Sequence, residues 1–293
     1  MSLARIFMGV NQKENYFVST ATAGVVYNLF IIISTVLFYK FGPLAPAMGA
    51  VLGALGQVLM QIPALIKQKL CPLPLSFLNK IEVIEILKIG LPRTMAMIIF
   101  ELVILFSITQ ANTFFVGAVA ILVFATNIYK APITLISASF SLASFPKMVE
   151  LFQSGNREGF ATYAGKSFSL ALFFSIPIMF FVMFFAKDIV GLLLGSAKFG
   201  LDKITLTGWI ISILSFSILA QSLVTLLMRL FYALSKTYIP LMAEGIFAIS
   251  FLIFYYLSVY LSLGFSSEYF GYQLLNLVSI FSISSFLSAM VLI

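Results

Sequence analysis

The chain has 293 residues, of which 61% are hydrophobic and 9% are charged, and its mean hydropathy is +1.11. A soluble domain carries about 25% charged residues, so this composition excludes the soluble class and indicates a polytopic membrane protein. The sequence contains no histidine and one cysteine, Cys71. Within this chain it therefore excludes an imidazole base or metal ligand and an internal disulfide bond.

Eight segments are apolar over about 20 residues, the length of helix that crosses a bilayer. They cover residues 17–38, 44–66, 86–109, 113–145, 165–186, 205–233, 238–263 and 269–293. The predicted fold class is therefore all-α, a helical bundle with about eight transmembrane helices. The fourth and sixth segments are longer than a bilayer requires, which indicates tilt or extension beyond it. Residues 187–203, between the fifth and sixth, are expected to form an amphipathic connector along the interface.

The basic residues gather on one side of this topology. Of the 17 lysines and arginines, twelve fall with the N-terminus and the 67–88, 147–166 and 229–237 connections, four fall on the opposite side, and Lys130 lies within a span. Loops rich in lysine and arginine stay in the cytoplasm, so these connections are predicted to be cytoplasmic. The net charge of +7 is thus mainly a topology signal, and it does not indicate nucleic-acid binding.

Both ends of the chain fall inside apolar runs. Residues 1–10 resemble the second half of a span, and residues 290–293 end without a polar tail, so we expect a piece of a longer protein. The alternative is a short re-entrant start and a flush end. A faint repeat relates RIFMGVNQ at 5–12 to RLFYALSK at 229–236, six spans later. Six crossings return the chain to the same side, so a real repeat predicts two parallel six-helix halves with a substrate between them.

The motifs of membrane enzymes are absent from the sequence. It has no DxD pair for a metal and a nucleotide-sugar, no HExxH, no GxSxG and no P-loop. We therefore expect neither catalysis nor a cofactor or metal. Without a nucleotide site, transport would draw on the membrane potential or an ion gradient.

Charged residues inside the spans are the candidate functional residues. Glu101 lies in the third span and Lys130 in the fourth, and charges at such depth face a bundle interior or a water-filled cavity. One interpretation is a buried Glu101–Lys130 ion pair that fixes helix register. The other is a polar cavity for an anionic or sugar-bearing substrate, which we favour for Lys130. Arg93 and Glu244 lie closer to span ends and are expected to reach the interface. Pro132 is expected to bend the fourth span.

Three glycines share one face of the second span. Gly49, Gly53 and Gly56 stand at spacings of four and three residues. Small residues at this spacing let two helix backbones approach closely in a membrane. We interpret them as packing residues.

Four segments together resemble the MurJ/MviN lipid II flippase family, within the multidrug/oligosaccharidyl-lipid/polysaccharide exporter superfamily, to which the MATE transporters also belong. They are GAVLGALGQVLMQIPALI at 49–66, LPRT at 91–94, FATNIYKAPITLISASFSLASFPKMVELFQSGN at 124–156 and RLFYALSKTYIP at 229–240. The resemblance runs along essentially the whole chain. It implies a fold of about fourteen helices, with two six-helix lobes around a central cationic cavity.

On this resemblance, residues 1–66 are the end of the first lobe, residues 67–88 are a cytoplasmic linker between the lobes, and residues 89–293 are the second lobe. The chain would then lack the first three to four helices and the last ones. That expectation agrees with the apolar runs at both ends.

The resemblance also implies site residues, with two departures. Family members carry an arginine in the eighth helix where this chain has Asn127, and Lys130 is the nearest cation, one turn away. They often carry an acidic residue late in the seventh helix where this chain has Ser107, with Glu101 about two turns earlier. Lys130 is therefore predicted as a cavity cation and Asn127 as a hydrogen-bonding group for sugar or phosphate. Glu101 is predicted as a partner or coupling carboxylate, and Arg93 as a residue of the cytoplasmic mouth.

The function that the resemblance implies is the flipping of lipid II, a polyprenyl-diphosphate-linked glycan, across the bacterial inner membrane by alternating access. The implied partners are that substrate, membrane lipids and a coupling cation, and no nucleic acid. Three alternatives stay open: a flippase for another lipid-linked oligosaccharide or a drug/cation antiporter of the same superfamily, an inactive truncated homologue, and a membrane enzyme that acts on polyprenyl substrates.

Overall fold

The computed structural model describes residues 2–13, 17–67, 80–195, 200–261 and 271–293. Within these ranges the chain is almost entirely helical and contains no strand, which confirms the all-α prediction. The helices are α1 (Ser2–Lys13), α2 (Phe17–Leu37), α3 (Leu44–Lys67), α4 (Lys80–Phe114), α5 (Ala118–Ile133), α6 (Ser139–Gln153), α7 (Arg157–Leu194), α8 (Leu201–Ala233), α9 (Tyr238–Tyr260) and α10 (Tyr272–Leu292). A short 3₁₀ turn, η1 (Tyr39–Phe41), follows α2, and a π-helical segment, η3 (Thr134–Ala138), joins α5 to α6.

Seven of the eight predicted spans correspond to helices that are long and apolar enough to cross a membrane, judged by length and composition in the described ranges. They lie at Leu44–Lys67, Gly90–Phe114, Ala118–Ile136, Arg157–Leu194, Leu201–Ala233, Tyr238–Tyr260 and Tyr272–Leu292. The predicted span 17–38 corresponds to α2, whose apolar part, Thr22–Leu37, is shorter.

Two predicted boundaries were wrong. The third span continues to Phe114, and a turn at Gly117, with φ +97°, separates it from α5, so residues 113–117 are not part of the fourth span. Both ends of the predicted connector 187–203 are helical, because α7 runs to Leu194 and α8 begins at Leu201. Buried Val190 continues the packed face of α7, so the helix extends past Lys187 and Asp188, the first residues of the predicted connector.

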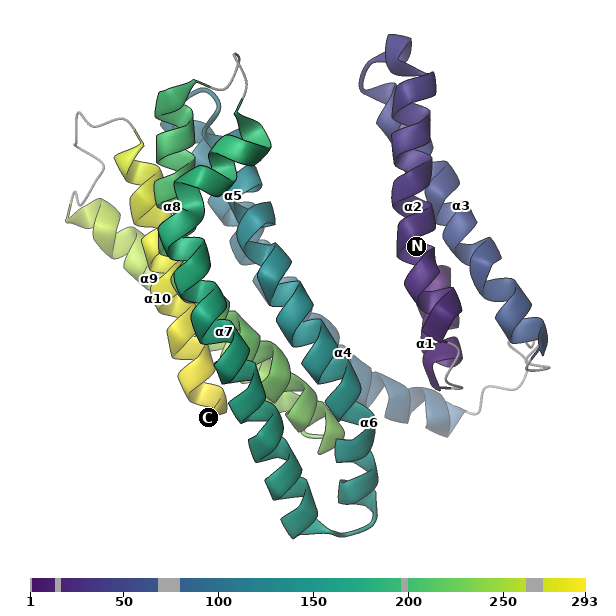
Figure 1. The fold of residues 1–293 in the computed structure, drawn as a ribbon. Coiled ribbons are helices and arrows are strands. Elements are labelled where there is room, and N and C mark those ends of the chain that lie inside the picture. The colour runs from purple at the N-terminus through teal and green to yellow at the C-terminus, as the bar shows by residue number, and fades with distance from the viewer. Residues whose placement is uncertain (1, 14–16, 68–79, 196–199, 262–270) are drawn as a thin grey trace. The chain divides into compact units, whose positions relative to one another are not determined.

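The chain divides into two units, Met1–Leu78 and Asn79–Ile293 (Figure 1). The division falls within the range 67–88 that had been predicted as a linker, although α4 already begins at Lys80.

In the first unit, α2 and α3 pack side by side and α1 contacts α3. The glycine face of α3 makes this close contact possible: a Cβ added to Gly49 would lie 2.7 Å from the Cα of Ile31 in α2, and one added to Gly53 would lie 2.9 Å from the carbonyl oxygen of Tyr27. This confirms the interpretation of the glycines as packing residues. A buried amide pair holds α1, because Asn11 Nδ2 donates to Gln61 Oε1 of α3 at 2.7 Å.

In the second unit, α8 is the central helix. It packs against α7, α10 and α5 (Figure 1), and it has the largest buried share among the seven candidate spans. The helix α4 packs mainly on α9. Since lipid tails are as apolar as the side chains, such helices associate through close van der Waals packing more than through the hydrophobic effect.

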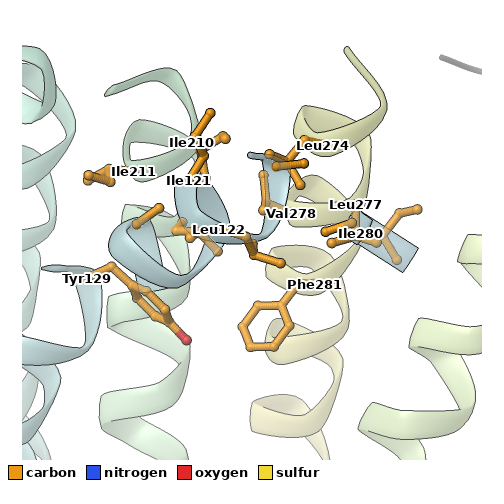
Figure 2. Close-up of a cluster of buried hydrophobic side chains, with 14 of the residues drawn as sticks. Ile121, Leu122, Tyr129, Ile210, Ile211, Leu274, Leu277, Val278, Ile280 and Phe281 are labelled. Carbon is orange, nitrogen blue, oxygen red and sulfur yellow. The ribbon is translucent and has the colours of Figure 1, made fainter. Parts of the chain in front are cut away.

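The core of this unit lies among α5, α8 and α10, as Figure 2 shows. Phe281 of α10 stands at its centre, with its ring centroid 5.3 Å from that of Phe247 and 6.4 Å from that of Tyr129. Both contacts are edge-to-face, the arrangement that aromatic quadrupoles favour. Tyr129 is 1% exposed, so it fixes which face of α5 turns inward.

Residues 118–145 of the fourth predicted span form one continuous helical path, whose winding changes from α-helical to π-helical at Thr134. Pro132 has no backbone N–H to donate, and the π-helical segment η3 starts two residues after it. A π segment inside an α-helix holds one additional residue in a turn and is one of the identified causes of helix bending.

Candidate functional site

The structure places Lys130 and Asn127 on neighbouring positions of α5, away from its buried face. Lys130 lies in the last turn of α5 and is half-buried, and Asn127, one turn earlier, is exposed. Tyr129 and Ala125, which flank them in sequence, point into the core. Both predicted site residues therefore stay available to groups outside the packed core of the second unit.

Glu101 does not pair with Lys130. In the part of the chain that the structure describes, no salt bridge or hydrogen bond joins these two side chains, and Glu101 is exposed on α4. The ion-pair interpretation thus has no support in this geometry.

Arg93 contacts the end of α8. Its guanidinium carbon lies 4.9 Å from the centroid of the Tyr232 ring, within the range of a cation–π contact. This contact joins the first half of α4 to the last turn of α8. Arg93 itself stays exposed, as expected for a residue near a span end.

A cavity of about 210 Å³, lined by both apolar and polar side chains, lies among α4, α8 and α9, and we refer to it as the α4–α8–α9 cavity. Its lining residues are Ala96, Met97, Phe100, Glu101, Gln221, Val224, Thr225, Met228, Tyr232 and Glu244. Glu101 and Tyr232 belong to this lining, so Arg93 stands next to the cavity through its contact with Tyr232. The cavity therefore brings two of the predicted site residues, Glu101 and Arg93, into one neighbourhood.

Glu244 was predicted at the interface, and this prediction was wrong. It is 5% exposed, and its Oε2 atom has no hydrogen-bond partner among the described residues. Glu244 shares a helix face with Pro240, Phe247 and Phe251, all of which are buried. Pro240 stands four residues before Glu244, and Phe247 and Phe251 stand three and seven residues after it. This helical spacing was visible in the sequence and could have placed the carboxyl group inside the bundle.

A row of polar residues that the sequence analysis missed extends from the cavity between α8 and α10. Gln221, which lines the cavity, donates from Nε2 to Ser285 Oγ at 3.2 Å. One turn along α8, Ser217 donates to Ser282 Oγ at 2.9 Å. These side-chain hydrogen bonds join helices inside an apolar medium, where they are worth about 1 kcal/mol each.

Ser107, at the position where the resemblance led us to expect an acidic residue, lies in an apolar setting. Its hydroxyl donates to the carbonyl oxygen of Val103 in its own helix at 2.8 Å. It lines a cavity of about 30 Å³ whose other lining residues are apolar except for Thr126. Ser107 thus lies in a mostly apolar cavity, whereas Glu101 and Glu244 both line the α4–α8–α9 cavity.

Two carboxyl groups, those of Glu101 and Glu244, line the α4–α8–α9 cavity. Across the described ranges, no group of three or more Cys, Asp or Glu residues is close enough to hold a metal ion. The α4–α8–α9 cavity offers two carboxyl groups together with the amide of Gln221 and the hydroxyl groups of Thr225 and Tyr232. An unpartnered carboxylate is costly in such a site, so Glu244 gains from a proton or a bound cation.

Comparison with solved structures identifies the fold. A structure of the lipid II flippase MurJ in an inward closed conformation matches 99% of this chain and 58% of its own, with a TM-score of 0.73 at 20% identity. A MATE transporter in complex with MaL6 matches 99% of this chain and 64% of its own, with a TM-score of 0.80 at 16% identity. The likeness to both at such low identity shows the fold that these transporters share.

Comparison with curated protein sequences finds relatives named as MurJ flippases. A probable lipid II flippase MurJ of Buchnera aphidicola subsp. Acyrthosiphon pisum is 23% identical over 247 residues, which is 83% of this chain and 48% of that protein. A probable lipid II flippase MurJ of Bdellovibrio bacteriovorus is 26% identical over 239 residues, or 80% of this chain and 46% of that protein. The chain thus spans about half the length of the curated relatives it matches. The family model described as lipid II flippase MurJ matches residues 1–292, and the chain therefore belongs to the MurJ family.

Proposed function

We propose that this protein flips lipid II, a polyprenyl-diphosphate-linked glycan, across the bacterial inner membrane by alternating access. The observation that carries the proposal is the family match along residues 1–292. The seven apolar helices support a multi-pass membrane location. The proposed activity is transport without a chemical step on the substrate.

Lys130, Asn127 and Arg93 are the proposed contacts for the diphosphate–sugar head group. Moving a diphosphate through a region of low dielectric is costly unless cations and hydrogen-bond donors replace its water. Lys130 is half-buried on α5 and has no salt bridge among the described residues, so its ammonium group remains available to an anion. Asn127 would add an amide for a sugar or phosphate oxygen, and Arg93 would meet the head group at the cytoplasmic mouth.

Glu101 and Glu244 are the proposed coupling residues. They line the same cavity, and the Oε2 atom of Glu244 has no partner in the described ranges. A proton or monovalent cation that binds there would favour the conformation in which the two carboxyl groups are close. An ion gradient could then drive the return of the empty protein, because a ligand shifts a conformational equilibrium by its difference in affinity for the two states.

The shared fold keeps a drug/cation antiporter as the second candidate. The MATE transporter in complex with MaL6 matches this chain with a TM-score of 0.80, against 0.73 for the MurJ structure, and a cavity with two carboxyl groups and two aromatic rings suits an organic cation. A flippase for another lipid-linked oligosaccharide would use the same contacts as the flippase for lipid II.

The test is complementation of a bacterium depleted of its own lipid II flippase, with the complete gene that encodes this chain. Rescue of growth is expected for the wild type and for Lys130→Arg, and loss of rescue for Lys130→Ala. Lys166→Ala is the matched control, because Lys166 is an exposed lysine in the first half of α7 and is expected to be dispensable. Failure of the wild type to rescue, with the protein present in the membrane, would reject lipid II as substrate. Full rescue by Lys130→Ala would reject the proposed cation.

Coupling has a separate test. The thermal unfolding midpoint of the purified protein is compared in sodium chloride and choline chloride at equal ionic strength and at several pH values. Sodium or protons are expected to raise the midpoint of the wild type and not that of Glu244→Gln. Glu158→Gln, at an exposed position in the first turn of α7, is the control. An equal response of the wild type and Glu244→Gln would remove Glu244 from the coupling site.

A further inference from the structure

A groove opens at the end of the second unit where α8 and α10 begin, and we refer to it as the outer groove. It has a volume of about 510 Å³. Its lining residues are Gly200, Asp202, Lys203, Thr205, Leu206, Trp209 and Leu275. This end lies opposite the α6–α7 and α8–α9 turns (Figure 1), around which Lys147, Arg157, Lys166, Arg229 and Lys236 lie. By the positive-inside rule it faces away from the cytoplasm.

The sole tryptophan of the chain, Trp209, is held at this groove by α7. The ammonium nitrogen of Lys187 lies 4.5 Å from the centroid of the Trp209 ring. Gly208 allows the two helices to approach, since a Cβ at that position would lie 2.6 Å from Cγ and 3.0 Å from Cα of Lys187. Trp209 is 52% exposed. An exposed tryptophan beside a lysine near the end of a span is typical of the headgroup level of a bilayer.

The groove lining carries two charged side chains of opposite sign, Asp202 and Lys203. Asp202 and Lys203 are both exposed, and neither side chain forms a salt bridge or hydrogen bond with any residue that the structure describes. The groove lining thus contains one carboxylate and one ammonium group, from consecutive residues of α8. Leu206, Leu275 and the ring of Trp209 supply an apolar wall beside them.

We propose that the outer groove binds a phospholipid whose head group carries one phosphate and one primary ammonium, as in phosphatidylethanolamine. Lys203 binds the phosphate, Asp202 accepts hydrogen bonds from the ammonium, and the first part of an acyl chain lies against Trp209, Leu206 and Leu275. An anionic lipid such as phosphatidylglycerol satisfies Lys203 but places no cation opposite Asp202. Phosphatidylcholine has the right charges, but its methylated ammonium has no hydrogen to donate to a carboxylate. The proposal is independent of the transported substrate.

Trp209 provides a direct probe, because it is the one tryptophan in the sequence. The protein is reconstituted in phosphatidylcholine vesicles that contain increasing fractions of brominated phosphatidylethanolamine, brominated phosphatidylglycerol or brominated phosphatidylcholine. Bromine quenches tryptophan fluorescence on contact. At equal low fractions we expect the ethanolamine lipid to occupy the groove about 1.5-fold to fivefold more than the others, the range that one exposed ion pair allows. Equal quenching by the three lipids would overturn the proposal and indicate ordinary lipid contact.

Two variants assign the charges. Asp202→Asn is expected to remove the preference for the ethanolamine lipid over phosphatidylglycerol, and Lys203→Gln to weaken quenching by both. Asp188→Asn is the matched control, since Asp188 is an exposed carboxylate at the same end of α7 that does not line the groove. A preference that survives Asp202→Asn, or that Asp188→Asn removes equally, would also overturn the proposal.

Discussion

Replacing Gly49 with alanine should push α2 away from α3. The added Cβ would lie 2.7 Å from the Cα of Ile31, 2.8 Å from the carbonyl oxygen of Phe30 and 2.9 Å from Cβ of Ser34. Carbon atoms pack best at about 3.5–4.0 Å, so the helices must separate by about 1 Å. The two nearest atoms are backbone atoms that no change of rotamer can move aside. The separation also stretches the bond from Ser34 Oγ to the carbonyl oxygen of Ala45, now 2.7 Å long.

The size of the effect follows from two opposing terms. Overpacking a close contact costs about 1–3 kcal/mol, and a rigid backbone contact places Gly49→Ala at the upper end. Alanine is a better helix former than glycine by about 1 kcal/mol. The expected net loss is therefore about 2 kcal/mol for the α2–α3 contact, which corresponds to about 30-fold faster opening.

The measurement is hydrogen exchange of α2 and α3 peptides in detergent micelles, followed by mass spectrometry. Peptides from α8 in the second unit serve as an internal reference. Gly24→Ala is the matched control, because Gly24 lies in α2 with no atom within 4 Å of its added Cβ. This control should slow exchange about fivefold, by the helix-propensity term alone.

The neighbouring glycines predict a graded series. Gly53→Ala meets Tyr27 at 2.9 Å, including its carbonyl oxygen, whereas Gly56→Ala meets side-chain atoms of Val26 at 3.0 Å and of Phe30 at 3.1 Å, which can shift. Destabilisation should therefore fall from Gly49 through Gly53 to Gly56. Unchanged or slower exchange in Gly49→Ala would refute the close-packing argument, as would equal effects at Gly49 and Gly24.

Three further substitutions test individual hydrogen bonds. Asn11→Ala leaves Gln61 Oε1 without its 2.7 Å donor and should cost about 1–3 kcal/mol, seen as faster hydrogen exchange in α1; an unchanged rate would mean that the amide pair adds nothing. Asn156→Ala removes the N-cap of α7, whose Oδ1 accepts from the backbone N–H of Gly159 at 2.8 Å, and should cost about 1 kcal/mol in urea or SDS titration, while Asn156→Ser should recover most of it. Tyr255→Phe removes a 2.8 Å hydrogen bond from α9 to α4 and should lower the thermal midpoint, and a midpoint equal to that of the wild type would contradict its role.

Hydropathy located the spans because each needs about 20 apolar residues, a signal that does not depend on tertiary structure. The glycines of α3 were also interpreted correctly, since their spacing alone puts them on one face. Boundaries were less accurate, because buried Val190 keeps α7 helical after the charged pair at 187–188. Span ends seen in sequence mark where polarity changes, whereas helix ends depend on packing.

The candidate site was harder to predict because depth along a span does not specify which way a side chain faces. Glu244 lies six residues into α9, where a long side chain can reach the interface, yet the buried face of its helix directs it inward. Glu101 and Lys130 were paired by their opposite signs, but their helices present them to different surroundings. The roles of Lys130 and Asn127 as substrate contacts stay predictions.

The π-helical segment Thr134–Ala138 sets the angular phase between two sets of side chains on one continuous helical path. Before it, α5 directs Lys130 away from the core; after it, Ser144 of α6 meets Ser167 of α7 at 3.0 Å between their hydroxyl oxygens. One residue of α-helix turns the chain by about 100°. Because the π segment holds one additional residue in a turn, it takes up a residue that would otherwise rotate α6 relative to α5 by that angle. The segment thus lets Lys130 and Ser144 both keep their directions, even though its own side chains need not touch a substrate.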